Sequence, residues 1–182
     1  MNSVQEYRFY IKFDGESVIP LQTLCVVLSE FNKLSDIATE GREKCEYSIV
    51  ANLPGSFETE LVARAIVGTT MFFEENGGYI KSILETIKTW VEIKKHLKGG
   101  KAKKVESKDG KLHIQNQDGE VKVTNMEGNR FFENANINNC VIYMGNSLLQ
   151  GETKGFSILT DQREEFLHCT NDEYPTLCSG DA

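Results

Sequence analysis

Three segments within the first 65 residues alternate apolar and polar side chains with the period of a β-strand. They are residues 7–13, 45–52 and 57–64, and Pro54-Gly55 separates the second from the third. A Pro-Gly pair between two alternating runs is typical of a turn, so 45–64 is predicted to be a β-hairpin. Between the first strand and the hairpin, apolar residues recur every three or four positions, which predicts an amphipathic helix over 20–40.

A second helical region is predicted over 67–98, with Gly77-Gly78 as an interruption. Its apolar stripe includes Ile83, Ile87, Trp90 and Leu97, at spacings that match the seam of a coiled coil. The same pattern is also typical of a helix lying on the sheet of its own domain. The hypothesis adopted is an oligomer interface formed by these four residues.

The segment 111–124 is predicted to form a second hairpin around Asp118-Gly119. Each of its strands offers only two apolar residues, and so thin a hairpin is marginally stable alone in water. It must therefore dock on another surface, and a symmetry-related copy of the chain is one candidate.

The remaining sequence predicts short strands over 137–144 and 156–159, with asparagine-rich loops around them. Residues 164–182 show weak periodicity and mostly acidic charge, which favours a loosely ordered C-terminus. The predicted fold class is α+β, with a small antiparallel sheet and two main helices in 1–100. A β-rich extension over 101–182 follows.

Charge is distributed unevenly along the 182 residues. Residues 81–111 hold ten lysines against four acids, whereas the rest of the chain holds ten Lys and Arg against 23 Asp and Glu. The solvated C-terminal end of a helix explains part of this pattern, because the helix dipole favours cations there. An anion-binding site is the alternative. Its predicted members are Lys94, Lys95, Lys98, Lys101, Lys103 and Lys104.

Motifs that carry catalysis, cofactors or metals are not found in the sequence. It contains no phosphate-binding loop, dinucleotide fingerprint or nucleophile elbow, and its three histidines lie far apart. Glu58 and Glu60 share one face of a predicted strand, where a solvated charged surface is the ordinary interpretation. We therefore expect no enzyme activity, no cofactor and no metal.

Composition points to the cytoplasm. The five cysteines are odd in number and irregularly spaced, which favours reduced thiols. No signal peptide and no apolar segment of membrane-spanning length is seen. Nucleic acid is an unfavoured partner, because arginines are scattered and no known binding motif is present.

One resemblance adds to this interpretation. The order strand, helix, Leu53-Pro54-Gly55-Ser56-Phe57-Glu58-Thr59-Glu60-Leu61, long helix, lysine-rich exit and Lys108-Asp109-Gly110 hairpin resembles uncharacterised proteins of bacteria and their phages or mobile elements. The resemblance covers roughly residues 5–125 and brings no catalytic residues with it. It implies a bacterial cell or an infected host cell, where small non-enzymatic proteins act in defence or counter-defence.

The sequence thus predicts a non-enzymatic, homo-oligomeric binding protein that sequesters an anionic, nucleotide-type ligand, and the resemblance suggests a role in phage or mobile-element counter-defence. The alternative is an acidic protein inhibitor whose carboxylates block a basic partner protein.

Overall fold

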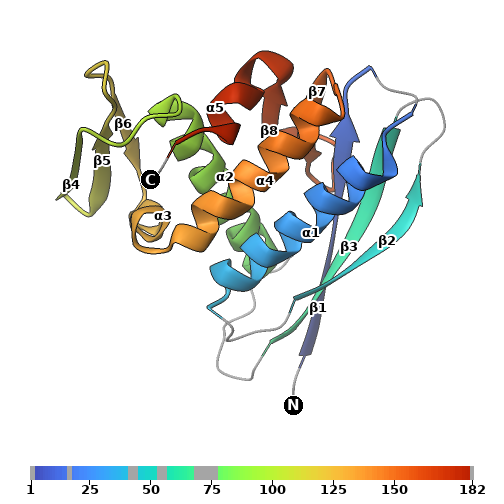
Figure 1. The fold of residues 1–182 in the computed structure, drawn as a ribbon. Helices are drawn as coiled ribbons and strands as arrows, with labels where there is room; N and C mark the ends of the chain where they lie inside the picture. Colours follow the sequence, from blue (N-terminus) through green and yellow to red (C-terminus); the bar gives the residue numbers. More distant parts are fainter. Residues whose placement is uncertain (1–2, 16–17, 41–44, 53–56, 68–77, 181–182) are drawn as a thin grey trace.

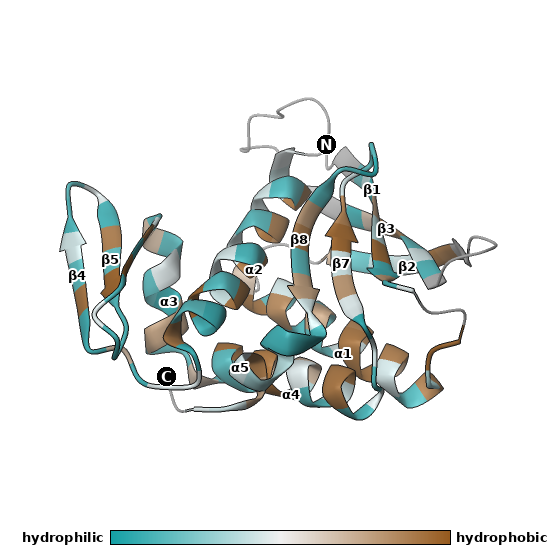
Figure 2. Ribbon diagram, turned by 90° about the horizontal axis from the view of Figure 1, so that it is seen from above, coloured by the Kyte–Doolittle hydropathy of each residue, from teal (hydrophilic) through white to brown (hydrophobic). Residues whose placement is uncertain are grey.

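The computed structural model describes residues 3–15, 18–40, 45–52, 57–67 and 78–180. A five-stranded antiparallel sheet has the order β2-β3-β1-β7-β8, and a three-stranded antiparallel sheet has the order β4-β5-β6. Helices cover one face of the larger sheet, and the smaller sheet stands at the far end of the molecule (Figures 1 and 2). The predicted α+β class is confirmed.

Strand β1 (Ser3–Phe13) is the centre of the larger sheet, paired with β3 (Phe57–Val67) on one side and β7 (Gly155–Leu159) on the other. Strand β2 (Cys45–Asn52) pairs with β3, as the hairpin prediction required, and the turn over 53–56 lies outside the described residues. The alternation seen in the sequence divides the two faces of β1. Phe9, Ile11 and Phe13 are buried on the helical side.

Helix α1 (Leu21–Ala38) confirms the first predicted helix, and α2 (Gly78–Leu97) confirms the later part of the second. Phe31 of α1 lies 5.5 Å from Phe9 of β1, ring centroid to ring centroid, so α1 is anchored on the sheet through aromatic contact. The predicted stretch 68–77 lies outside the described residues.

The strand predicted over 137–144 is wrong, because this segment belongs to helix α4 (Ala135–Gln150). Short α3 (Asn129–Glu133) precedes it. The side chain of Asn134 accepts a hydrogen bond from the backbone N–H of Asn136, so an asparagine taken for loop chemistry is the N-cap of the helix. Ile137, Val141 and Met144 then fall on its buried side at helical spacing.

The C-terminal segment, predicted to be loosely ordered, forms β8 (Glu165–Thr170) and the short helix α5 (Tyr174–Cys178). Strand β8 pairs with β7, so the last strands complete the sheet that begins at the N-terminus. Helix α5 lies against α4 so closely that a Cβ added at Gly145 would be 2.6 Å from the Cβ of Leu177. Weak periodicity in 164–182 therefore reflects short elements, each packed on residues distant in sequence.

The smaller sheet contains β4 (Lys104–Lys108), β5 (Lys111–Gln115) and β6 (Val121–Thr124). The predicted hairpin over 111–124 is confirmed as β5 and β6, and β4 adds a third strand through the turn Asp109-Gly110. Both turn residues have positive φ, 52° and 71°, as a two-residue hairpin turn requires.

This small sheet docks on its own chain. Leu112 and Ile114 of β5 are buried, and the side-chain amide of Asn116 donates to the carbonyl of His96 in α2, at 3.0 Å. Leu112 also approaches Gly128 of the 3₁₀ turn η1 (Met126–Gly128). The thin hairpin thus finds its support on α2 and η1. No helix within the described ranges combines the length and apolar character needed to span a membrane.

Candidate functional site

The four residues of the predicted oligomer interface lie inside the chain. Ile83, Ile87, Trp90 and Leu97 are each no more than 4% exposed. The indole Nε1 of Trp90 also donates to the backbone oxygen of Glu127, at 3.1 Å. The stripe on α2 is consequently part of the chain's own core, and it offers no surface to a second copy. The interface hypothesis for these residues is corrected on this point.

The six predicted anion-binding lysines are separated by the structure. Lys94 is 2% exposed, and its Nζ donates to Oδ1 of Asn138 at 2.6 Å and to the carbonyl of Gly180 at 3.1 Å. It links α2, α4 and the C-terminal segment. A buried ammonium with these partners is structural, so Lys94 does not belong to a ligand site.

Lys95 and Lys98 form ion pairs at the surface. Nζ of Lys95 lies 2.9 Å from Oε1 of Glu173 and donates to the carbonyl of His168. Lys98 pairs with Asp118 and Glu120 in the β5–β6 turn, and these two carboxylates raise the pKa of Lys98, that of Glu120 more strongly. Lys98 thus clamps the small sheet to the end of α2.

Lys101, Lys103 and Lys104 are exposed at the start of the small sheet. Lys104 pairs with Glu106 of the same strand at 2.6 Å, and that hydrogen bond lowers the pKa of Glu106. The register of the sheet brings other basic groups beside this pair, because Glu106 faces His113 and Lys108 faces Lys111. The sequence alone did not indicate that these residues are neighbours.

Two hollows lie beside the small sheet, one between α2 and β6 and the other over β4, β5 and β6. One hollow of about 510 Å³ and a second of about 320 Å³ share Val121 as a lining residue. Together they define what we call the basic groove, with four lysines, two histidines and two glutamates among its lining residues. Its lining residues are Glu92, Lys95, His96, Lys104, Glu106, Lys108, His113, Gln115, Val121 and Lys122.

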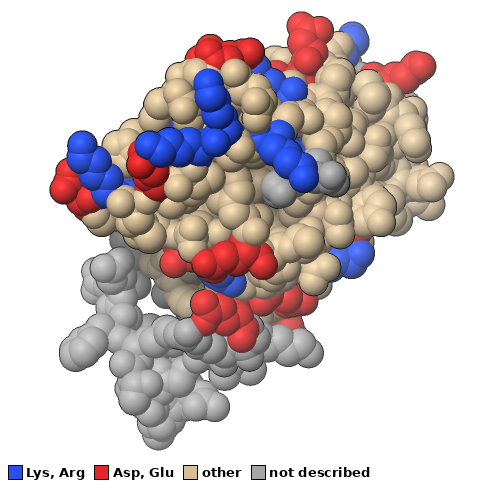
Figure 3. All heavy atoms as spheres, turned by 60° about the vertical axis from the view of Figure 1, so that its left-hand side comes forward, with Lys and Arg blue, Asp and Glu red and all other residues tan. Residues whose placement is uncertain are grey.

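The groove carries an excess of positive charge. Glu92 pairs with Lys122 at 3.3 Å and Glu106 with Lys104, whereas Lys108 pairs with no carboxylate among the described residues. Figure 3 shows Lys and Arg gathered on this side of the molecule, with acids beside them. The histidines, Lys108 and Lys122 could have been found from sequence only by assigning the strand register.

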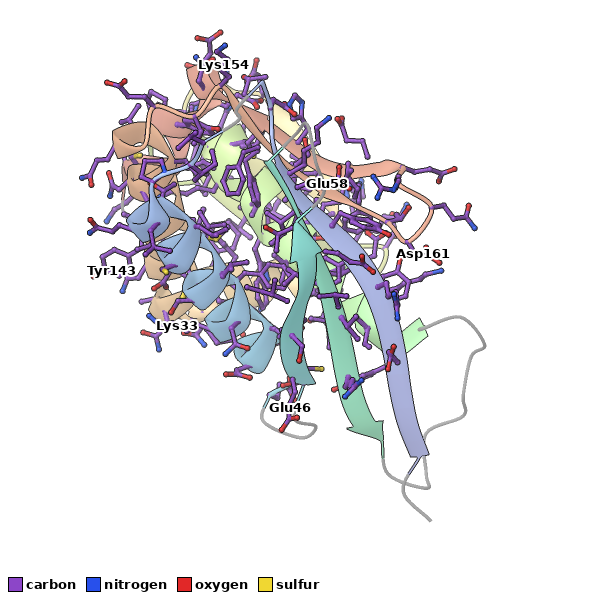
Figure 4. All side chains as sticks on the ribbon, turned by 90° about the vertical axis from the view of Figure 1, so that its right-hand side faces the viewer. Lys33, Glu46, Glu58, Tyr143, Lys154 and Asp161 are labelled. Carbon is purple, nitrogen blue, oxygen red and sulfur yellow. The ribbon has the colours of Figure 1, made fainter. Side chains whose placement is uncertain are left out.

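The acids singled out in the sequence are also paired. Glu58 is buried and accepts from Arg163 at 2.6 Å, and Glu60 accepts from Arg8 at 3.0 Å. Both lie on the sheet face opposite the helices, where Figure 4 places Glu58 near the upper end of the strands. Both carboxylates therefore form ion pairs with arginines and do not make a free acidic pair.

Within the described part of the chain, Cys169 and its neighbour His168 do not form a catalytic pair, and no group of metal ligands is assembled. Cys169 is buried on the helical side of β8, while its neighbour His168 lies on the other face and meets Asp14 at 2.8 Å. Burial raises the pKa of Cys169 to about 12, which opposes thiolate formation. Across the described ranges, no three His, Cys, Asp or Glu side chains are grouped for a metal ion.

Comparisons with protein-family models, with curated proteins and with solved structures each give no match to this chain.

Proposed function

We propose that the protein is a non-enzymatic binding protein that holds an anionic small molecule, of the nucleotide type, in the basic groove. The observation that carries the proposal is the convergence of four lysines and two histidines on two adjoining hollows. Both hollows have the size of small-molecule sites in proteins. The lysines come from α2, β4 and β6, so the proposed site depends on the tertiary structure rather than on a local charge run.

The existing ion pairs define how such a ligand binds. Lys104 and Lys122 already have carboxylate partners, so a phosphate would share these ammonium groups with Glu106 and Glu92. Lys108 supplies the uncompensated charge. The glutamates also disfavour an extended polyanion, since a continuous phosphate backbone would run against them. A compact anion with few charged groups is the best match.

Two further parts of the hypothesis remain predictions. A homo-oligomer is still expected, although the α2 stripe no longer supplies its interface. Sequestration of a signalling nucleotide in phage counter-defence depends on the resemblance alone. The alternative, an acidic inhibitor of a basic partner protein, would rely on exposed acids such as Glu164 and Glu165, because Glu58 and Glu60 are paired.

The proposal is tested by isothermal titration with ATP, with inorganic phosphate and with the neutral nucleoside adenosine. The double variant Lys104→Gln/Lys108→Gln is expected to weaken ATP binding about tenfold or more, a loss of about 1.4 kcal/mol. The matched control Lys81→Gln/Lys154→Gln removes the same charge from exposed positions outside the groove. Binding should also weaken with added salt, because exposed charges are screened.

Chromatography of the recovered ligand tests the non-enzymatic part, since ATP should return unchanged. Equal losses in the two double variants, or no binding of either anion, would contradict the proposal. If neutralising Glu164 and Glu165 abolished the biological activity of the protein and the lysine variants kept it, the result would instead favour the acidic-inhibitor hypothesis.

A further inference from the structure

The lysine that α2 contributes to the basic groove is bound through its ammonium group to another part of the chain. Lys95 lines the hollow between α2 and β6. Its Nζ lies 2.9 Å from Oε1 of Glu173 and donates to the backbone carbonyl of His168 at 3.1 Å. Neither partner lines that hollow, because one belongs to β8 and the other to the 3₁₀ turn η2 (Asn171–Glu173). The C-terminal part of the chain therefore holds the charge of Lys95 outside the groove.

Glu173 is fixed in place by the turn that it closes. It forms a capping box with Thr170, in which each side chain accepts a hydrogen bond from the backbone N–H of the other residue. Oε2 of Glu173 accepts from the backbone nitrogen of Thr170 at 2.9 Å, which leaves Oε1 for Lys95. Thr170 thus holds the carboxylate independently of Lys95.

The segment that carries Glu173 is anchored on both sides of this residue. Strand β8 pairs with β7 before it, and Tyr174 and Leu177 of α5 are buried after it. The hydroxyl of Tyr174 also makes a buried hydrogen bond of 2.8 Å with Oγ1 of Thr153. Lys95, by contrast, carries its ammonium on a flexible four-carbon stem. Of the two ion-pair partners, the lysine is therefore the one that is free to move.

The ion pair is accessible enough to open. The side chain of Lys95 is 24% exposed and that of Glu173 is 37% exposed. Ion pairs at such positions contribute little to stability, because water solvates the separated charges. An anion in the hollow would meet Lys122, which also lines it, and would attract Lys95 as a second cation. The ligand and Glu173 then compete for the same ammonium group.

We infer that Glu173 is an autoinhibitory counter-charge of the anion site, which holds Lys95 outside the basic groove and lowers the affinity of the groove for a phosphate-bearing ligand. The inference rests on the proposed function, whose site it regulates. When Glu173 loses its charge or a ligand displaces it, Lys95 turns into the hollow beside Lys122 and contacts the phosphate.

The variant Glu173→Gln tests the inference, because glutamine keeps an oxygen for the backbone N–H of Thr170 while the charge is removed. Calorimetric titration with ATP is carried out near physiological ionic strength, where exposed charges more than ~8 Å apart are screened. The variant should bind ATP about two- to fivefold more tightly, as expected from the strength of an exposed ion pair. Asp172→Asn, which removes the same charge from the neighbouring exposed residue, is the control and should change the affinity much less.

A double-mutant cycle separates the release of Lys95 from a general change in charge. In the background of Lys95→Gln, the substitution Glu173→Gln should no longer alter the affinity for ATP, because no ammonium is left to be released. If the gain came only from the removal of a negative charge near the groove, it would persist in this background.

A second measurement needs no ligand. The rate at which an N-hydroxysuccinimide ester acetylates Lys95, read by mass spectrometry, should rise in Glu173→Gln and stay unchanged in Asp172→Asn. Tighter ATP binding that depends on Lys95, together with faster acetylation, establishes the inference.

The outcomes that overturn the inference are distinct from those that overturn the proposed function. Equal affinity of the wild type and Glu173→Gln for ATP refutes the inference and leaves the proposed function in place. A gain that persists without Lys95, or an unchanged rate of acetylation, has the same consequence. If neither the wild type nor Glu173→Gln binds ATP or inorganic phosphate, the proposed function and the inference are both wrong.

Discussion

Replacing Trp90 with alanine should unfold individual chains rather than separate chains from one another. The indole is fully buried between α2 and the segment that follows the small sheet, and Nε1 donates to the carbonyl of Glu127 at 3.1 Å. The guanidinium carbon of Arg130 lies 5.4 Å from the ring centroid. Truncation removes all three contributions and leaves a cavity in the core.

The magnitude follows from these contacts. Removing a buried Trp or Phe side chain costs about 3–5 kcal/mol. Loss of the hydrogen bond adds about 1 kcal/mol. A typical domain is stable by only about 5–15 kcal/mol, so Trp90→Ala should approach the limit of folding. The milder Trp90→Phe, which keeps a ring and loses the hydrogen bond, should cost about 1–3 kcal/mol.

Equilibrium unfolding in urea, followed by far-ultraviolet circular dichroism, measures the change in the free energy of unfolding. Fluorescence is unsuitable because Trp90 is the only tryptophan. Leu149→Ala, an exposed apolar substitution, is the control and should stay within about 0.5 kcal/mol of wild type. Each transition is recorded at two protein concentrations, since the stability of an interface depends on concentration and that of a core does not.

This prediction would be refuted if Trp90→Ala stayed folded with unchanged stability and its particle in solution had a lower molecular mass than that of the wild type. That result would show that the α2 stripe faces a second chain. A similarly negative result would be a wild-type midpoint that rises with concentration and loses that dependence in Trp90→Phe.

Three further predictions concern a buried lysine, two buried thiols and one exposed thiol. Lys94→Met should lower the free energy of unfolding by about 1.5–3 kcal/mol, because it leaves Asn138 without its charged donor, and should leave anion binding unchanged; lost binding with unchanged stability would restore Lys94 to the ligand site. Burial raises the pKa of Cys140 and of Cys169 to about 12, so the folded state holds these protons more tightly than the unfolded state. Their contribution to the free energy of unfolding is complete below about pH 8.5 and is lost as the pH rises toward 12. Urea titrations at several pH values measure this decrease, which should be absent from the double variant Cys140→Ala/Cys169→Ala. Exposed Cys25 should react with a thiol reagent well before either of them, which mass spectrometry of the labelled chain would show.

Local pattern was sufficient for the strands and helices whose periodicity is uninterrupted. The alternation in 7–13 and in the 45–64 hairpin directly identifies β1, β2 and β3, because side chains of a strand point alternately to two faces and here one face is buried. Asp118-Gly119 located the β5–β6 hairpin for a similar reason, since Gly119 adopts a positive φ of 86°. These features depend on neighbours within a few residues.

The prediction for the segment of helix α4 was wrong because its apolar residues and its asparagines gave conflicting local signals. Its apolar residues predict a short strand and its asparagines predict loops. In the structure Asn134 is a cap, Asn138 is buried against Lys94, and Asn136, Asn139 and Asn146 line hollows between α1 and α4. Spacings of three and four among Asn136, Asn139, Tyr143 and Asn146 were the available signal. Whether such a row of polar residues lines a hollow between two helices can be decided only when the facing helix is known.

The sequence by itself determined that the α2 stripe is buried and that the chain carries a basic segment within an acidic remainder. It did not determine what buries the stripe or which lysines reach solvent. Lys94 and Lys108 have the same charge in the sequence, yet one is held beneath α4 and the other lines the basic groove. The tertiary structure decides this difference, because burial and ion pairing depend on residues brought together from distant positions, while hydrophobic period and charge count record only the side chain itself.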